Sequence, residues 1–175
     1  MRLFLALTPP DGLRARLGKL AELAQAHCGG RRVPEESLHL TLAFLGEQPA
    51  ERAKTLGDWL CQQAVRPGSW HLDRWGHFQR PGIVWVGSSR PTTALQTLQG
   101  ELWTGLEALG VKGRPERFIP HITLLRKATR PPGPELPCID MPWVYTRVEL
   151  IHSVVTQQGS HYRTLARSIL PEETP

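Results

Sequence analysis

The feature that most constrains the fold is an arrangement of residues that the chain contains twice. An amphipathic helical segment is followed by a basic, proline-containing loop and then by an apolar segment that begins with the pattern His-x-Thr-Leu. From a core-facing leucine of the helix to the histidine the distance is 26 residues in both copies, Leu13 to His39 and Leu95 to His121. Two such units predict two similar lobes whose equivalent strands meet across a pseudo-two-fold cleft.

The hydrophobic periodicity predicts a mixed α+β fold. Three segments have helical spacing and are bounded by Pro or Gly: Asp11 to Gly29, Pro49 to Pro67 and Thr93 to Gly110. Seven runs have strand character, and the last two are expected to form a hairpin: Arg2–Leu7, Leu38–Leu45, Trp70–Phe78, Ile83–Val86, Ile119–Leu125, Tyr145–Val155 and Tyr162–Ile169. The proline-rich stretch Arg130–Pro142 is expected to be a loop or an edge connection. Helices and strands do not alternate strictly, which excludes a doubly wound sheet.

Length and cysteine content indicate one domain in a reducing compartment. The chain has 175 residues, which suits a single domain of two lobes over residues 1–175. Its three cysteines, Cys28, Cys61 and Cys138, are odd in number and form no C-x-x-C pair, which argues against a disulfide framework and against a thiolate zinc site. We therefore expect a cytoplasmic protein. No apolar run approaches the roughly 20 residues of a membrane span, and the short apolar start fits a strand better than a signal peptide.

The charge distribution favours a polyanionic partner. The formal net charge is +5 and the isoelectric point is about 9.6. The region around the second histidine motif carries six basic residues against the single acid Glu116: Lys112, Arg114, Arg117, Arg126, Lys127 and Arg130. Such a run is usually only a solvated surface. Because this one brackets a histidine motif, we expect it to bind phosphate.

Each His-x-Thr-Leu segment places an imidazole and a hydroxyl on the same face of a strand. Residues two apart in a strand point the same way, so His39 lies beside Thr41 and His121 beside Thr123, with the leucines turned to the core. Imidazole titrates near pH 6.5, so one histidine can remove a proton from a nucleophile while its partner protonates a leaving oxygen. The hydroxyls can bind non-bridging phosphate oxygens. A single histidine in an apolar strand usually has a packing role, but two copies in equivalent places favour phosphoester chemistry that needs no metal.

On these residues the chain resembles the two-histidine phosphoesterases, in particular the bacterial and archaeal RNA 2′,3′-cyclic phosphodiesterases, also called 2′-5′ RNA ligases. The resemblance runs nearly from end to end. Besides the two motifs it includes the first strand, the segment His39 to Glu47, the run Val84-Trp85-Val86-Gly87, and scattered positions in the last third of the chain: Phe118, Pro120, Arg126, Ser153, Gly159, Tyr162 and Leu165.

The resemblance implies a bilobal, duplicated fold in which two antiparallel sheets line a central cleft, with helices on the outside. It also implies hydrolysis of an RNA 2′,3′-cyclic phosphate to a 2′-phosphomonoester. The resemblance implies that His39 is the general acid and His121 the general base. It also implies that Thr41 and Thr123 bind phosphate oxygens, that Arg126 makes a cationic contact to the phosphate, and that Phe44 stacks on the nucleobase. The acid and base roles can be exchanged. Strict alternation places Phe44 and Arg126 on the face opposite the histidines, unless the strands end or bulge there.

Three other functions remain open from the sequence. A 5′-hydroxyl in place of water would make the same site a 2′-5′ RNA ligase, because the same acid and base serve both directions. An RNA-binding module without catalysis would explain the basic residues but not the paired motifs. A metal hydrolase would lose activity in a chelator. We expect RNA with a cyclic phosphate end as the partner of a monomer, with no cofactor, no metal and no membrane contact.

Overall fold

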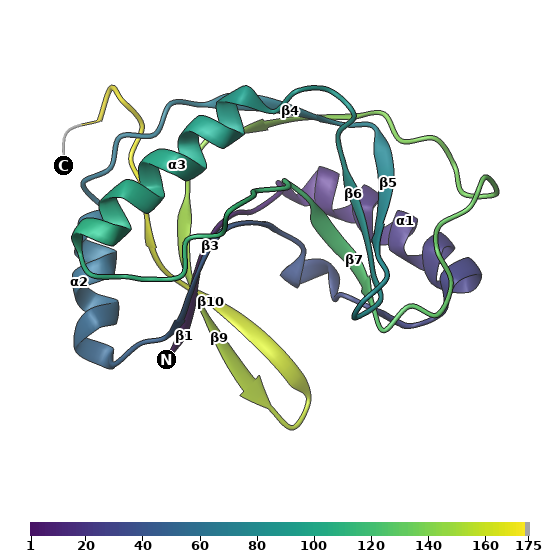
Figure 1. The fold of residues 1–175 in the computed structure, drawn as a ribbon, viewed down its shortest axis with the longest axis horizontal. Coiled ribbons are helices and arrows are strands. Elements are labelled where there is room, and N and C mark those ends of the chain that lie inside the picture. Colours follow the sequence, from purple (N-terminus) through teal and green to yellow (C-terminus); the bar gives the residue numbers. More distant parts are fainter. Residues whose placement is uncertain (174–175) are drawn as a thin grey trace.

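The structure is a computed structural model that describes residues 1–173; the last two residues of the predicted domain lie outside the described part. In that part the chain forms three α-helices, ten strands and one short 3-10 helix, η1 (Figure 1). Their bounds in chain order are β1 (Arg2–Leu7), α1 (Asp11–Cys28), β2 (Arg31–Arg32), η1 (Glu35–Ser37), β3 (Leu40–Glu47), α2 (Ala50–Leu60), β4 (Gly68–Leu72), β5 (Arg74–Phe78), β6 (Ile83–Gly87), α3 (Thr93–Ala108), β7 (Ile122–Arg126), β8 (Met141–Tyr145), β9 (Glu149–Thr156) and β10 (Gly159–Arg167).

The strands form two antiparallel sheets, which confirms the predicted α+β class. The larger sheet has the order β10-β9-β1-β3-β7-β6-β5, and β2 also pairs with β7. Its centre is narrow, because β3 and β7 share the single residue pair Leu40↔Ile122. On either side of that pair lies a half of four strands. The smaller sheet consists of β4 and β8 and lies above the larger one in Figure 1.

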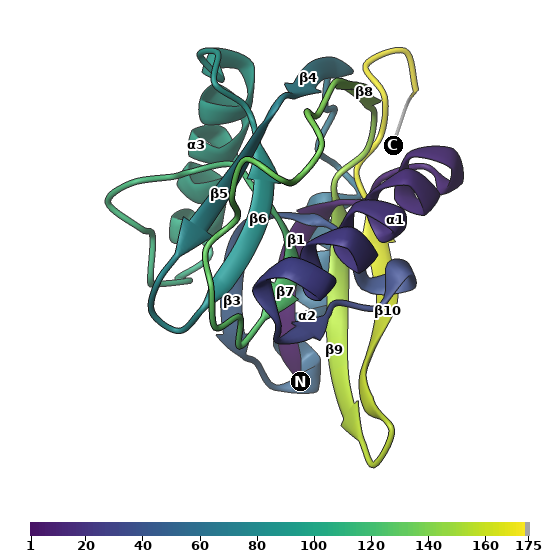
Figure 2. The same ribbon diagram turned by 90° about the vertical axis from the view of Figure 1, so that its right-hand side faces the viewer.

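The helices cover the apolar face of the larger sheet. Helix α1 packs on β7, α2 on β9 and β10, and α3 on β3. Their buried residues, such as Leu17, Leu56 and Trp103, form one core with the fully buried Leu40 and Ile122. The opposite face carries a second, small apolar cluster, which consists of Phe4, Ala6 and Ile151 with Tyr162 packed against it. Figures 1 and 2 both show the β9–β10 hairpin projecting beyond the body of the molecule.

The predicted elements are largely confirmed, but two long strands are each divided. The run Trp70–Phe78 forms the end of β4 and all of β5, in different sheets, and the run Tyr145–Val155 is divided between β8 and β9. The second helix ends at Leu60 rather than near Pro67. The proline-rich stretch is irregular as predicted up to β8, where Pro142 occupies an edge strand. All three cysteines are free, and no helix among residues 1–173 is long and apolar enough to cross a membrane.

Replacement by alanine should change the free energy of unfolding in opposite directions at two glycines, one at each end of α1. Gly12 lies in the first turn of α1, where a Cβ would have no heavy atom within 4 Å. Gly12→Ala should raise the free energy of unfolding by about 0.5–1 kcal/mol, because alanine has less conformational entropy to lose than glycine. Gly30 has a φ of +81°, and its Cβ would lie 2.5 Å from the carbonyl oxygen of Arg126. Gly30→Ala should therefore be destabilising, as measured by urea denaturation. Equal stability of the two variants would contradict this account of the turn.

Candidate active site

The single pair between β3 and β7 brings the two histidine motifs together. His39 immediately precedes Leu40, and His121 immediately precedes Ile122, so each histidine lies next to one member of the pair. The strands are antiparallel, and the paired side chains are fully buried in the core. In this register, His39 and Thr123 flank one side of the pair, and Thr41 with His121 the other. All four lie on the face opposite the core.

Backbone carbonyls orient both imidazoles in the same way. His39 Nδ1 lies 2.7 Å from the carbonyl oxygen of Ser37, and His121 Nδ1 lies 2.7 Å from that of Ile119. A carbonyl oxygen only accepts, so in both neutral rings Nδ1 carries the hydrogen and Nε2 the lone pair. His39 Nε2 lies 2.8 Å from Thr41 Oγ1 and accepts that hydrogen bond. Both Nε2 atoms face away from the backbone carbonyls, and that of His39 becomes free to act on a substrate once the Thr41 hydroxyl turns to another acceptor.

Aromatic rings surround the two imidazoles. Phe4 and Tyr162 lie 4.8 and 5.4 Å from the His39 ring, measured between centroids. Phe78 and Trp85 enclose the other imidazole, at 5.2 and 5.7 Å from the His121 ring. Tyr162 lies half-buried, packed against the small apolar cluster of Phe4, Ala6 and Ile151. These contacts exclude water from one side of each imidazole.

Burial lowers the pKa of both histidines. Desolvation lowers the pKa of His39 to about 4, and the charges of Arg126 and His121 act in the same direction against the hydrogen bond to Ser37. The pKa of His121 is also lowered, mainly by desolvation and further by the charge of Arg126. Both rings are therefore neutral in the free protein at pH 7, in the tautomer that the carbonyl contacts select.

Matching β-bulges place Phe44 and Arg126 at equivalent, exposed positions. Leu42 is the extra residue in β3, where the partners of β1 shift by one, and Leu124 is the extra residue in β7 against β6. Each bulge reverses the alternation of its strand. Strict alternation therefore does not hold here, and the alternative of a bulge, under which Phe44 and Arg126 need not lie on the face opposite the histidines, is the one that the structure has. Each is the fifth residue after its histidine.

The two residues present different chemistry on the cleft side. Phe44 is 66% exposed, and its ring lies 6.3 Å from that of Phe4. Arg126 is exposed as well, and its charge lies close enough to lower the pKa of both His39 and His121. One half of the sheet thus contributes an apolar ring and the other a cation.

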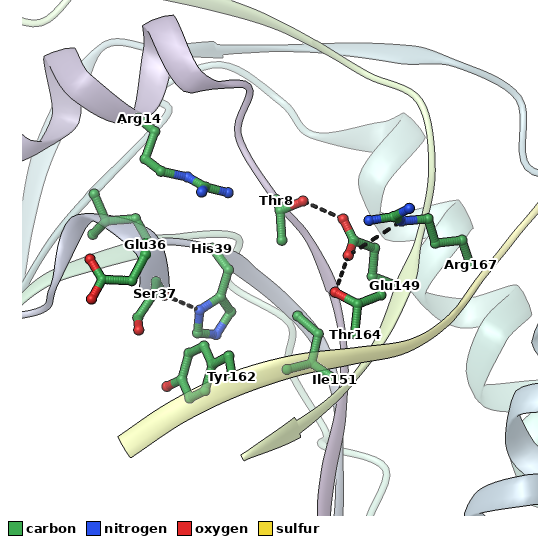
Figure 3. A pocket seen from close by; sticks show the side chains of 11 residues that line it. Thr8, Arg14, Glu36, Ser37, His39, Glu149, Ile151, Tyr162, Thr164 and Arg167 are labelled. Carbon is green, nitrogen blue, oxygen red and sulfur yellow. Dashed lines mark hydrogen bonds and ion pairs between the residues drawn. The ribbon is translucent and has the colours of Figure 1, made fainter. Parts of the chain in front are cut away.

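A polar cavity of about 270 Å³ lies beside His39 (Figure 3). One of its lining residues is the buried Glu149, whose carboxylate accepts hydrogen bonds from Thr8 at 2.5 Å and Thr164 at 2.6 Å, with Arg167 Nε at 3.6 Å. The sequence did not indicate this cluster, because its members come from the residue after β1, from the start of β9 and from β10.

His71, on β4 of the smaller sheet, donates a hydrogen bond from Nε2 to Asp140 Oδ1 at 2.5 Å. Among residues 1–173, no three His, Cys, Asp or Glu side chains gather in a group that could hold a metal ion.

Comparison with known proteins identifies similar sequences and structures. Residues 9–141 match the family model of the "2'-5' RNA ligase superfamily". The chain is 32% identical to the RNA 2′,3′-cyclic phosphodiesterase of Escherichia coli, over 98% of this chain and 97% of that protein. It is 31% identical to the protein of the same name from Thermus thermophilus, over 99% and 92% of the two chains.

Solved structures of E. coli LigT have the same fold. The apo form has a TM-score of 0.81 and 32% sequence identity, and the alignment covers 97% of this chain and 96% of LigT. The complex with 3′-AMP also has a TM-score of 0.81, with 30% identity and 98% of each chain covered.

The lowered pKa of His39 predicts a specific loss of stability in acid. An unfolded histidine binds a proton near pH 6.5, whereas the folded His39 does so near pH 4. Its contribution is therefore present above pH 6.5 and is lost as the pH falls toward 4. Between pH 7 and pH 5 this group should remove about 2 kcal/mol from the free energy of unfolding. Urea denaturation at the two pH values should show a smaller difference for His39→Gln than for the wild type.

The exposed His161 provides the control for that measurement, since His161→Gln also removes one imidazole. If His39→Gln and the wild type lost the same stability between pH 7 and pH 5, His39 would not be held in its neutral form by the fold.

Proposed function

The chain belongs to the 2′-5′ RNA ligase superfamily, and we propose that it hydrolyses 2′,3′-cyclic phosphates at RNA ends to 2′-phosphomonoesters without a metal ion. Its curated relatives bear the name RNA 2′,3′-cyclic phosphodiesterase, and the chain is a hydrolase of that class. The observation that carries the finer proposal is the presence of two identically oriented imidazoles on one face of the sheet, next to the pair Leu40↔Ile122.

The reaction needs one proton removed and one proton supplied. The oxygen of a water molecule attacks the phosphorus, and one histidine takes the water proton at Nε2. The bond from phosphorus to O3′ breaks, and the other histidine gives its proton to O3′, which becomes a hydroxyl. The phosphate stays on O2′. Each acid or base role contributes roughly 10² to 10⁴ in rate.

We assign the acid role to His39 and the base role to His121, following the family resemblance. His121 is neutral at pH 7 and can accept a proton at once. His39 is neutral too in the free protein, because its pKa is about 4. It becomes an acid when a bound phosphate anion compensates the cost of desolvating its charged form. On this assignment, substrate binding is accompanied by proton uptake at His39.

The remaining site residues bind the two ends of the terminal nucleotide. Thr41 and Thr123 donate to non-bridging phosphate oxygens and stabilise the charge that develops on them. The Arg126 guanidinium adds a charge-assisted contact to the same phosphate. Phe44 stacks on the nucleobase, because an exposed ring on the cleft side offers a flat apolar surface.

The same proposal covers the protein as a whole. It acts as a single two-lobed domain and as a monomer in the cytoplasm, on RNA and without a cofactor. The site also allows ligation, in which a 5′-hydroxyl replaces water as the nucleophile, the bond from phosphorus to O3′ breaks and a 2′-5′ linkage forms. The description of the matching family model favours this second activity, and ligation is measured by supplying a 5′-hydroxyl oligonucleotide in the hydrolysis assay.

Removal of either histidine should abolish turnover. With an RNA oligonucleotide that ends in a 2′,3′-cyclic phosphate and with EDTA present, the wild type should release a 2′-phosphate end. His39→Ala and His121→Ala should each lower kcat by about 10² to 10⁴. The matched control is His71→Ala, which removes a histidine of the separate two-stranded sheet.

The outcomes of that assay separate the competing functions. Full activity of either cleft variant would overturn the two-histidine mechanism, and activity that EDTA abolishes would identify a metal hydrolase. A folded wild type that binds the RNA but never converts it would be an RNA-binding module.

Phe44 should affect binding more than chemistry. Phe44→Ala removes a stacking surface worth about 1–3 kcal/mol, so the KM for the same RNA should rise about tenfold or more while kcat changes little. Phe44→Trp, which keeps a ring, should retain the wild-type KM. Val144→Ala is a suitable control, because Val144 is as exposed as Phe44, 65% against 66%, but lies on β8. An unchanged KM for Phe44→Ala would remove Phe44 from the binding site.

A further inference from the structure

Two arginines lie directly opposite each other at the end of the cleft strand β7. The register of β2 against β7 pairs Arg31 with Arg126. Residues opposite each other in an antiparallel pair project to the same face, with Cβ atoms about 4.5–5.5 Å apart, and like charges in such a pair repel. Both side chains are exposed, and among residues 1–173 neither forms a hydrogen bond or ion pair with a carboxylate. The pair is thus a concentration of positive charge without an internal counterion.

Arg32, the next residue along β2, differs from Arg31 in having an acidic partner. Arg32 is paired with the buried Leu125, and its Nη1 lies 3.2 Å from Glu22 Oε1 on α1. It therefore belongs to the helix side of the sheet. Arg31 shares the face of Arg126, whose charge lowers the pKa of both catalytic histidines. Of the two adjacent arginines, only Arg31 is paired with Arg126, and it also borders a cavity that Arg32 and residues of α1 line.

The backbone around Arg31 is built to hold this register. Gly29 and Gly30 both have positive φ, +72° and +81°, which turns the chain from α1 into β2. A Cβ on Gly30 would collide with the carbonyl oxygen of Arg126. Immediately after Arg126, Lys127 adopts a φ of +55° without being glycine. Such conformations persist where the surrounding structure fixes them, often beside ligand clamps.

The position of the pair extends the catalytic site in one direction. β7 begins just after His121 and ends at Arg126, and β2 joins it at that far end. A phosphate held between the histidines and Arg126 leaves Arg31 one strand farther along the cleft. We propose that Arg31 binds a phosphodiester of the RNA chain adjacent to the cyclic phosphate, so that the site is built for oligonucleotides rather than cyclic mononucleotides. This assignment rests on the proposed function.

The test compares two substrates with the same reacting end, a 2′,3′-cyclic mononucleotide and a trinucleotide that ends in it. The wild type should have the higher kcat/KM for the trinucleotide. Arg31→Gln should lower that value about tenfold, because a charge-assisted contact is lost, and should leave the mononucleotide within about twofold. The dependence of log kcat/KM on log salt for the trinucleotide should become shallower by about 0.7. Arg32→Gln, the matched control, should change neither substrate.

The Tm of thermal unfolding distinguishes RNA binding by Arg31 from a purely structural role of this residue. Arg31→Gln relieves the repulsion with Arg126, so its Tm should equal or exceed that of the wild type. A lower Tm with equal losses on both substrates would assign Arg31 to the fold. Equal losses with an unchanged Tm would place it on the cyclic phosphate itself. Unchanged kcat/KM values for both substrates would show that Arg31 does not contact the RNA. Each of these results overturns the proposal.

A binding measurement keeps this assignment separate from the proposed function. If the wild type hydrolysed neither substrate, the proposed reaction would fail, but the Kd of a fluorescent trinucleotide with a 2′-phosphate end would still test Arg31. Arg31→Gln should raise that Kd about tenfold relative to Arg32→Gln. An unchanged Kd would overturn the phosphodiester contact.

Discussion

The backbone pairing of Leu40 with Ile122 is the contact on which the rest of the structure depends. It is the single residue pair between β3 and β7, and it joins the two four-stranded halves of the larger sheet. Because both side chains are fully buried, their neighbours face the other way, toward the cleft. A histidine precedes both Leu40 and Ile122 in the sequence, and because the strands are antiparallel the two histidines have equivalent orientations. One pair thus closes the core on one face of the sheet and assembles the site on the other.

The bulges turn this symmetric frame into an asymmetric site. Leu42 and Leu124 occupy the same place in the two strands, and each redirects the residue two positions later to the histidine face. Had the alternation continued, Phe44 and Arg126 would have had to enter the core, at a high cost for a guanidinium. With the bulges, the two equivalent positions carry a ring and a cation. An RNA end likewise has two different parts, a flat base and a charged phosphate.

The parts of the fold that follow from local periodicity could be predicted, and those that depend on distant contacts could not. His39 and Thr41 share a face because of the strand period, and α1 ends where two glycines follow it. The bulges have no such signal, because Leu42 and Leu124 are ordinary strand residues. The break between β4 and β5 falls at Asp73, whose carboxylate accepts hydrogen bonds from Ser89 sixteen residues later. The Glu149 cluster depends on a contact with Thr8, which is 141 residues away in the sequence and is brought close only in the folded chain.

Burial and charge at the cleft act together on the two imidazoles. The aromatic contacts desolvate each ring, and Arg126 adds a positive potential, so both effects favour the neutral forms in the free protein. A bound phosphate anion would offset the positive potential of Arg126, because its negative charge stabilises a proton on the imidazole. On the proposed function, the arginine that binds the phosphate therefore adds to the desolvation that keeps both imidazoles neutral until the substrate arrives. Phosphate binding and proton binding are linked through one electrostatic field, and each must strengthen the other by the same factor.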